Sequence, residues 1–345
     1  MNSNTLATGK KEIKIITEKS RKKSKNGIRN ISLFTMLIPG AVLIFILNYL
    51  PMFGIIIAFK KINMRDGILK SPWIGLENFK FMFRSEDAWL ITRNTVGYNL
   101  IFIVFGLIIA VALAIALNEV RNKTLSKIYQ TIMLMPHFLS FVVVSYLVLA
   151  FLNVENGYLN KHILPLLGME PVSWYTNPKP WPWILIIVHF WKVAGYSSIV
   201  YLAAIAGIDT ELYEAAEIDG ANKWNQIVYI TIPSLKQLMT IMTILNFGKI
   251  FNADFGLFYQ VPLDSGALYS ATYVINTYVY NMLTSAGTSS LGMASAAALY
   301  QSFVGFILVI ICNTIVRKID SSNSLFKSNL VICQEINFNK NKRKT

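Results

Sequence analysis

The 25 residues from Asn94 to Asn118 read NTVGYNLIFIVFGLIIAVALAIALN and contain no charged side chain. A helix of about 20 apolar residues can cross the hydrocarbon core of a bilayer, because all its backbone hydrogen bonds are made within the segment. The stretch is continuous and lacks the strict alternation of polar and apolar residues typical of a strand in a membrane barrel. It therefore predicts a membrane-spanning helix.

Five further apolar stretches are long enough to span a bilayer. They run from Leu33 to Phe59, Tyr129 to Leu152, Pro182 to Gly207, Gln237 to Phe258 and Gly292 to Val316. The chain is 54% apolar and only 14% charged, and the charged share is about half that of a soluble domain. We therefore expect an all-α polytopic membrane protein with six transmembrane helices.

The fifth of these stretches is unusual because it contains Lys249 and Asp254. Ionisable side chains are costly in lipid, so this span either ends early or faces water or other protein. The residues from Thr272 to Leu283 mix Tyr and Asn with Val and Ile. We expect a short helix there, at the outer surface, followed by the last span.

The distribution of Lys and Arg predicts the orientation. With six spans, residues 1–32, 119–128, 208–236 and 317–345 share one side and carry 21 positive residues, against 9 in the segments of the other side. The two sets have nearly equal length, 100 and 96 residues. The positive-inside rule then places both termini in the cytoplasm.

The expected organisation is a basic tail (1–32), a transmembrane domain (33–318) with a cytoplasmic loop at 208–236, and a C-terminal tail (319–345). The first apolar stretch is too long for a signal peptide, so it is expected to remain as a helix. The net charge of +14 does not indicate nucleic-acid binding, because the basic residues are not interleaved with aromatic residues on one face.

The cytoplasmic loop contains an ordered polar segment from Asp209 to Pro233, DTELYEAAEIDGANKWNQIVYITIP. One helical face carries Leu212, Ala215 and Ala216, and acidic groups recur at Glu211, Glu214 and Glu217. Gly220 permits a sharp turn, and a second helical piece is expected to run until Pro233. A helix, a bend and a helix with small and acidic residues suit docking to a basic groove of a partner. The alternative is an amphipathic helix lying on the membrane, which the negative inner leaflet disfavours for an acidic segment.

Part of this segment resembles a known motif. Glu214-Ala215-Ala216, followed by Gly220 and Ile230-x-Ile232-Pro233, resembles the EAA motif of permeases from binding-protein-dependent ABC importers, and Asp219 and Ala221 fit its longer form. Ile232 replaces the usual Leu. Other segments resemble the polysaccharide and oligosaccharide branch of these permeases, so that the resemblance covers Leu33 to Lys318: YLPMFGI at 49–55, SPWIGLENF at 71–79, LNEVRNK at 117–123, MPHF at 135–138 and NTYVY at 276–280.

The resemblance implies a permease subunit that imports a carbohydrate, with a coupling helix from Glu211 to Asn225 in a cleft of a separate ATPase. Glu214 would face a basic residue there, and Gly220 would form the turn. The implied coupling residues are Glu211, Glu214, Ala215, Ala216, Asp219, Gly220, Ala221 and Pro233. The implied partners are a cytoplasmic ABC ATPase dimer, a second permease subunit, an external solute-binding protein and membrane lipid.

The chain has no Gly-rich loop ending in Gly-Lys-Ser/Thr, because Gly248-Lys249 is followed by Ile250. ATP and Mg²⁺ are therefore expected on the partner ATPase, with no cofactor on this chain.

Candidate residues of the substrate path lie in the fourth and fifth predicted spans: Trp191, Lys192, Asn246, Lys249 and Asn252. Aromatic faces and amides suit a sugar, which presents apolar C–H faces and hydroxyl edges. For Lys192 a structural interpretation is equally good: an ion pair, or a bond to helix carbonyls, at a subunit contact. A sharper hypothesis is that the two lysines favour an acidic sugar such as a uronate.

Two other functions are alternatives to sugar import. A membrane-embedded enzyme acting on lipid-linked sugar needs paired carboxylates or a histidine constellation, and no such pattern is formed by the outer-loop acids Asp66, Glu77, Glu86, Asp87, Glu155, Glu170 and Asp264. His137 and His189 have no carboxylate or cysteine at ligand spacing, so neither a catalytic nor a metal site is predicted. An importer of the same architecture for a peptide or amino acid is disfavoured only by the branch-like segments.

Overall fold

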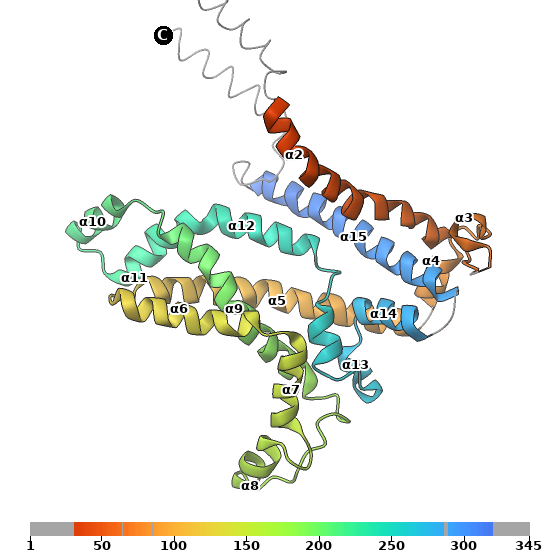
Figure 1. Ribbon diagram of the computed structural model, residues 1–345. Helices are drawn as coiled ribbons and strands as arrows, with labels where there is room; N and C mark the ends of the chain where they lie inside the picture. Colours follow the sequence, from red (N-terminus) through yellow and green to blue (C-terminus); the bar gives the residue numbers. More distant parts are fainter. Residues whose placement is uncertain (1–30, 64, 85, 286–288, 320–345) are drawn as a thin grey trace, which may run out of the picture. The chain divides into compact units, whose positions relative to one another are not determined.

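The computed structural model describes residues 31–63, 65–84, 86–285 and 289–319. The predicted tails 1–32 and 319–345 lie almost wholly outside these residues. Within the described ranges the chain is helical, and the pairing of extended backbone is limited to one bridge between Lys60 and Trp73. The all-α prediction is thus confirmed. The chain divides into two compact units, one ending at Ile56 and one beginning at Ile57 (Figure 1).

The first span runs from Thr35 to Phe59, and all but its last three residues belong to the first unit. That unit consists of α2 (Ile31–Ile44), the π-helical turn η2 (Phe45–Tyr49) and the start of the 3₁₀ helix η3 (Leu50–Phe59). The Asn48 amide donates a 3.3 Å hydrogen bond to the Ile44 carbonyl, so this polar group finds its partner inside the helix.

The described part of the second unit contains long apolar helices and a bent pair, joined by short helices (Figure 1). The long helices are α5 (Glu86–Asn118), α9 (Trp181–Ile205), α12 (Ile232–Gly248) and α15 (Ser289–Ile319). The bent pair is α6 (Lys123–Phe138) and α7 (Phe141–Leu152). The short helices are α3 (Gly67–Lys70), α4 (Glu77–Arg84), η4 (Leu159–Ile163), α8 (Leu164–Leu166), α10 (Thr210–Ile218), α11 (Lys223–Gln226), η5 (Ile227–Thr231), η6 (Gly256–Gln260), η7 (Gly266–Leu268), α13 (Tyr269–Thr272) and α14 (Ile275–Ser285).

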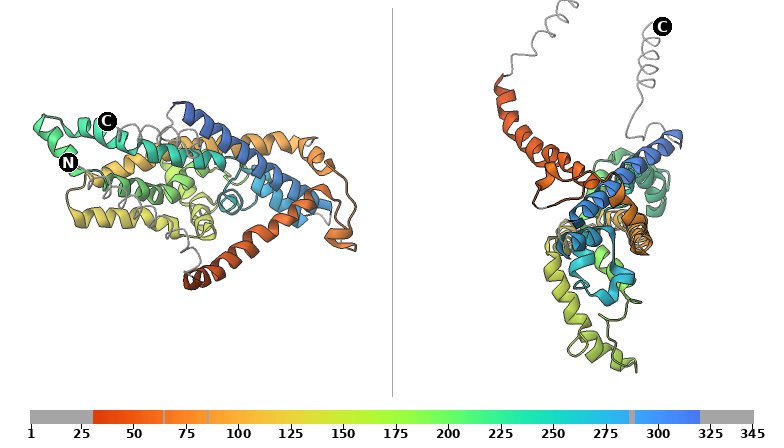
Figure 2. Two further views of the ribbon diagram at one scale, coloured as in Figure 1. Left: turned by 90° about the horizontal axis from the view of Figure 1, so that it is seen from above. Right: turned by 90° about the vertical axis from the view of Figure 1, so that its right-hand side faces the viewer.

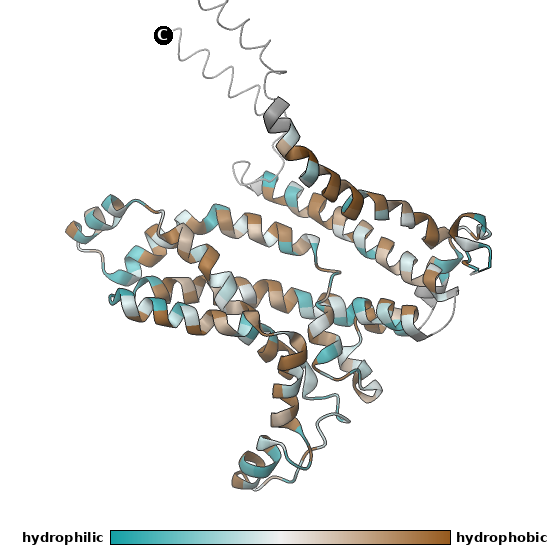
Figure 3. Cartoon of the chain, viewed as in Figure 1, coloured by the Kyte–Doolittle hydropathy of each residue, from teal (hydrophilic) through white to brown (hydrophobic). Residues whose placement is uncertain are grey.

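Helix α9 is central to the packing of this unit, because both α5 and α6 lie along it (Figure 2). Trp181 and Leu185 of α9 are fully buried, together with Leu257 of η6. The Trp181 indole donates to the Trp174 carbonyl at 2.7 Å, which satisfies its polar atom. Hydrophobic residues predominate on α5, α12 and α15, whereas α10 and the segment around α8 carry many hydrophilic residues (Figure 3).

The third span is broken, whereas the hydropathy predicted one continuous helix from Tyr129 to Leu152. Helices α6 and α7 meet at 96°. Ser140 has extended backbone angles, and its hydroxyl accepts a 3.3 Å hydrogen bond from the Val143 amide, which starts α7 afresh. With this broken span counted once, the six predicted spans are present in the described residues.

The fifth span is shifted toward the N-terminus relative to the prediction of Gln237 to Phe258. A continuous helix runs from Lys223 to Gly248, so the predicted helix end at Pro233 is wrong. Pro233 lies in the first turn of α12, and the Ile232 amide bonds to the Ile227 carbonyl across the wider turn η5. In a π-type turn an amide bonds to the carbonyl five residues earlier instead of four. This wider turn lies directly before Pro233, which has no amide proton to donate. The early end is confirmed, since Lys249 already lies beyond the helix.

The short helix predicted at Thr272 to Leu283 is present as α14, which begins at Ile275 after a bend at Tyr273. Two side chains of α5 hold the bend. The Asn94 amide donates to the Tyr273 carbonyl at 3.0 Å, and the Thr95 hydroxyl accepts from the Ile275 amide at 3.0 Å. The last span follows in α15, from Ser290 to Lys318.

Candidate functional site

The predicted docking segment folds as the short helix α10 followed by a turn. The Asp209 carboxylate caps α10 by accepting a 3.0 Å hydrogen bond from the Glu211 amide. Glu211 lies in the first turn, where a negative charge is favourable because the helix dipole is positive there. The sequence therefore stabilises a helix too short to form alone.

Gly220 ends α10 in the left-handed backbone region, with φ of +80°. Its amide donates to the Glu217 carbonyl at 3.1 Å, and the Ala221 amide reaches back to the Ala216 carbonyl at 2.8 Å. These bonds satisfy carbonyls at the helix end, in a geometry that only glycine adopts without strain. Asn222 then caps α11 by accepting a 2.9 Å bond from the Asn225 amide, so the helix, bend and helix arise from successive local signals.

Helix α10 and the turn present an unusual surface, here called the docking face: Leu212, Glu214, Ala215, Ile218 and Trp224. All five are exposed, and Ile218 and Trp224 are 86% and 70% accessible. Large apolar side chains clustered beside acidic groups are typical of a surface that another protein covers. Ile218 and Trp224 were not among the predicted coupling residues, although both are large apolar residues in a polar loop.

A side-chain hydrogen bond joins α10 to the fifth span. The hydroxyls of Tyr213 in α10 and Thr231 in η5 lie 2.9 Å apart. Thr231 is buried, and the helix continues from η5 through Pro233 into α12. The backbone and this side-chain contact therefore both connect α10 to α12.

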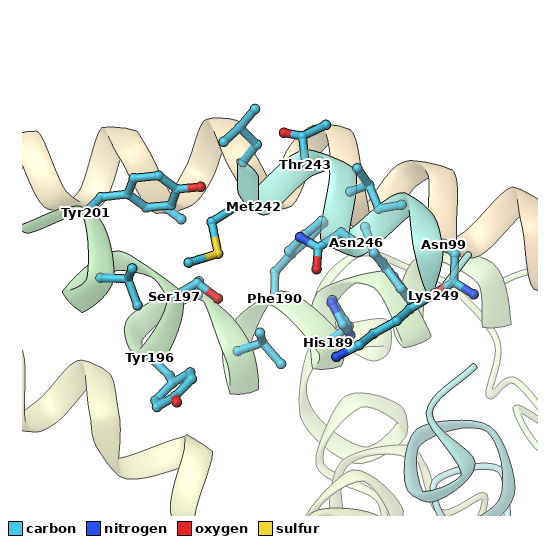
Figure 4. Close-up of a pocket in the computed structure, with 18 of the residues that line it drawn as sticks. Asn99, His189, Phe190, Tyr196, Ser197, Tyr201, Met242, Thr243, Asn246 and Lys249 are labelled. Atoms are coloured by element: carbon cyan, nitrogen blue, oxygen red, sulfur yellow. The ribbon is translucent and has the colours of Figure 1, made fainter. Parts of the chain in front are cut away.

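A cavity of about 450 Å³ lies between α5, α9, α12 and the turn that follows α12 (Figure 4). Aromatic and aliphatic side chains such as Phe102, Phe190 and Met242 form part of its wall. The polar side chains on its wall are Asn99, His189, Tyr196, Ser197, Tyr201, Thr243, Asn246, Lys249 and Asn252. Lys249 places a positive charge on the cavity wall. Among the residues that the structure describes, no Asp or Glu lines this cavity.

The structure brings together three of the five predicted substrate-path residues, since Asn246, Lys249 and Asn252 all line this cavity. Trp191 and Lys192 do not line it. Trp191 is 46% exposed on another face of α9. Lys192 is buried and donates to carbonyls at the end of α6. The predicted bond to helix carbonyls is therefore present, but within this chain and not at a subunit contact.

Helix α9 contributes wall residues that were not among the predicted ones, including Tyr196, Ser197 and Tyr201. They follow His189 by seven, eight and twelve residues, spacings that place all four residues on one broad face of the helix. His189 stacks on the Phe102 ring with 3.6 Å between centroids. Asn99 of α5 donates to the Ile250 carbonyl at 2.8 Å and so fixes the turn that carries Lys249.

Several known proteins are similar to this chain over most of its length. Residues 102–321 match the family model described as binding-protein-dependent transport system inner membrane component. Protein LplB of Bacillus subtilis is 35% identical over 84% of this chain and 89% of its own length. The polygalacturonan/rhamnogalacturonan transport system permease YteP of the same organism is 33% identical over 83% of this chain and 88% of its own.

Among solved structures, a bacterial ABC transporter involved in import of the acidic polysaccharide alginate contains a chain similar to this one. Its TM-score is 0.77 at 32% sequence identity, over 87% of this chain and 99% of that chain. The same transporter has also been solved in complex with a periplasmic protein that holds an alginate pentasaccharide.

Proposed function

Because the chain belongs to the family of binding-protein-dependent transport system inner membrane components, we propose that it carries an oligosaccharide with carboxylate groups, such as a uronate chain. The chain is a multi-pass membrane permease of a sugar ABC importer, a transport subunit and not an enzyme. The resemblance recognised in its EAA-like segment is thereby confirmed.

The observation that carries the proposed cargo is the position of Lys249. Its side chain lies on the cavity wall among the amides of Asn99, Asn246 and Asn252. The exposed ammonium of Lys249 can pair with a carboxylate that enters the cavity, and the amides can hydrogen-bond sugar hydroxyls. YteP and the alginate importer are both named for polymers that contain acidic sugars, which supports the same class of cargo.

We propose further that the docking face binds a cytoplasmic ATPase, which supplies ATP and Mg²⁺. Glu211, Glu214, Ala215 and Ala216 would enter a cleft of that subunit, while Asp219, Gly220 and Ala221 form the turn and Pro233 begins the helix that moves. Closure of the two ATPases would pull α10 and tilt α12 through the Tyr213–Thr231 contact. The 21-to-9 distribution of positive residues supports placing this loop and both termini in the cytoplasm.

The remaining proposed partners are a second permease subunit and an external solute-binding protein. The family description names dependence on a binding protein, and the alginate importer was solved with its periplasmic protein bound. The cavity of one permease would then be completed by the other subunit, at the membrane midplane, where transporters bind their substrates.

The proposed cargo is tested by uptake into proteoliposomes that contain the complete complex and its binding protein. Labelled trigalacturonate serves as the acidic probe and maltotriose as the neutral one. Lys249→Met is expected to lower trigalacturonate uptake at least tenfold, because an attraction worth about 1.4 kcal/mol changes an equilibrium tenfold. Lys249→Arg keeps the charge and is the matched control. Uptake of trigalacturonate at the parent rate by Lys249→Met would remove the uronate hypothesis.

The proposed coupling is tested by Glu214→Lys, which places a positive charge opposite the expected basic groove. We expect this variant to insert in the membrane and to lose both uptake and copurification with the ATPase. Glu214→Gln removes the charge without reversing it and should retain part of both. Parent-level transport by Glu214→Lys would exclude the coupling role.

A further inference from the structure

Three aromatic side chains, Phe255, Tyr259 and Tyr280, form a cluster on the segments that follow Asn252, which lines the cavity, and its hydrogen-bond partner Asn276. We propose that this cluster, here called the aromatic platform, stacks against a pyranose ring of the oligosaccharide while a neighbouring sugar unit occupies the cavity. The inference rests on the proposed function and adds to it a second sugar subsite that does not depend on charge.

The rings of the aromatic platform contact one another in all three pairs. The centroids of Phe255 and Tyr259 lie 4.7 Å apart with the rings nearly parallel, at 17°. Tyr280 lies 4.8 Å from Phe255 and 4.9 Å from Tyr259, tilted against both. Rings in mutual contact hold each other's orientation, so the surface they share is formed before any ligand arrives.

The backbone around η6 explains why these rings are displayed. Leu257 and Phe258 are 0% and 2% exposed and anchor η6 in the core. The Asp254 carboxylate accepts a 2.9 Å hydrogen bond from the Gly256 amide and fixes the start of η6. At Gly256 a Cβ atom would overlap the Phe141 ring, so the glycine lets η6 lie directly against α7. Phe255 and Tyr259 are half-buried and Tyr280 is 37% exposed.

The aromatic platform adjoins the cavity through a pair of amides. Asn252, which lines the cavity, accepts a 3.0 Å hydrogen bond from the Asn276 amide. Asn276 in turn accepts from the Ala253 amide and from Gln301, each at 3.1 Å. Tyr280 lies four residues after Asn276 in α14, on the same helical face. The amide pair therefore links the cavity wall to the face of α14 that carries Tyr280.

This arrangement suits the two kinds of surface that a sugar presents. The C–H face of a pyranose is apolar and packs on aromatic rings, while its hydroxyl edge needs donors and acceptors such as amides and tyrosine hydroxyls. Burial, and after it the neighbouring Asp264 and Tyr280, raises the pKa of Tyr259, so its hydroxyl remains protonated.

The test measures equilibrium binding of defined sugars to the purified complex by calorimetry, without the binding protein. The probes are trigalacturonate and galacturonate, with maltotriose and glucose as the neutral pair. We expect Tyr280→Leu to raise the Kd of the trisaccharide about tenfold, in line with the stacking of one ring. The Kd of the monosaccharide should not change, because one unit occupies the cavity alone. Tyr280→Phe keeps the ring and should bind both sugars like the parent.

The inference is overturned if Tyr280→Leu leaves the Kd of the trisaccharide unchanged, or if it weakens both sugars of a pair equally. The first result leaves the rings as a structural or lipid-facing cluster, and the second indicates damage to the cavity itself. Because acidic and neutral sugars are both measured, failure of this inference can be distinguished from failure of the proposed acidic cargo. If the parent binds maltotriose and not trigalacturonate, the uronate class fails while the neutral pair still tests the aromatic platform.

Discussion

The ammonium group of Lys192 donates a 3.0 Å hydrogen bond to the backbone carbonyl of His137, in the last turn of α6. It also donates to the carbonyls of Pro136, at 3.3 Å, and Leu139, and it lies 4.8 Å from the centre of the Phe141 ring. The last carbonyls of a helix have no partner within it, and such groups are costly to leave unpaired away from water. Lys192 thus stabilises the break between α6 and α7.

Replacement of Lys192 by Met should therefore destabilise the subunit without altering its preference between acidic and neutral sugars. The loss of hydrogen bonds from a charged donor is worth about 1.5–3 kcal/mol. We expect a lower Tm of the purified complex and an unchanged ratio of trigalacturonate to maltotriose uptake per folded complex. Lys192→Arg, which keeps the charge and the donors, should recover part of the Tm. A changed uptake ratio in Lys192→Met would instead assign this lysine to the substrate path.

At Gly220 the expected effect depends on backbone geometry and not on space. A Cβ atom at this position meets no atom within 4 Å, but φ is +80°. Gly220→Ala should cost about 1 kcal/mol, the strain of a left-handed residue with a side chain. Gly220→Pro is incompatible with that φ and also removes the amide that bonds to the Glu217 carbonyl.

We expect Gly220→Ala to lower ATP-dependent uptake modestly, and Gly220→Pro to abolish it while the subunit remains in the membrane. The measurement compares uptake with the amount of membrane-inserted protein. Equal transport by the two variants would show that the turn geometry has no part in coupling.

Ile218 offers a test of the docking face that leaves the fold of the subunit alone. Its side chain is 86% exposed, so Ile218→Ser should change the stability of the isolated subunit by no more than about 0.5 kcal/mol. In the complex, loss of a buried apolar contact should weaken binding of the ATPase several-fold. The measurement is the salt-stable fraction of ATPase that copurifies. Leu69, 84% exposed in the short helix α3, provides the matched control as Leu69→Ser, which should leave copurification unchanged.

The sequence predicted the elements that depend on composition and local signals. Hydropathy locates the spans because lipid requires long uncharged helices. Asp209 and Gly220 locate α10 because capping and left-handed turns depend on individual residues. The break at Ser140 was not predicted, because the sequence around it remains apolar and the bend is stabilised by Lys192, more than 50 residues later in the chain.

Only part of the candidate site was predicted from the sequence. Asn246, Lys249 and Asn252 were recognisable because polar groups are rare in an apolar span. Lys192 has equal polarity, but the sequence does not say which side of α9 faces the cavity and which faces α6. The platform residues Phe255, Tyr259 and Tyr280 come from two separate segments, so their contact follows only from the packing of η6 beside α14.

The contact between α6 and α9 yields a last prediction, at Gly195. A Cβ atom there would overlap the carbonyl oxygen of Met133, so this glycine allows the two helix backbones to touch. The same contact aligns Lys192 with the end of α6 and stacks His137 on Tyr196, with 4.3 Å between centroids. Gly195→Ala should therefore push α6 away from α9 and destabilise the fold by about 2 kcal/mol through overpacking.

Gly97→Ala is the control, since a Cβ at that position of α5 meets nothing within 4 Å. Alanine also favours a helix over glycine by about 1 kcal/mol. Thermal unfolding of the purified complex should give a lower Tm for Gly195→Ala and an equal or higher Tm for Gly97→Ala, and the same Tm for both variants would contradict the close contact.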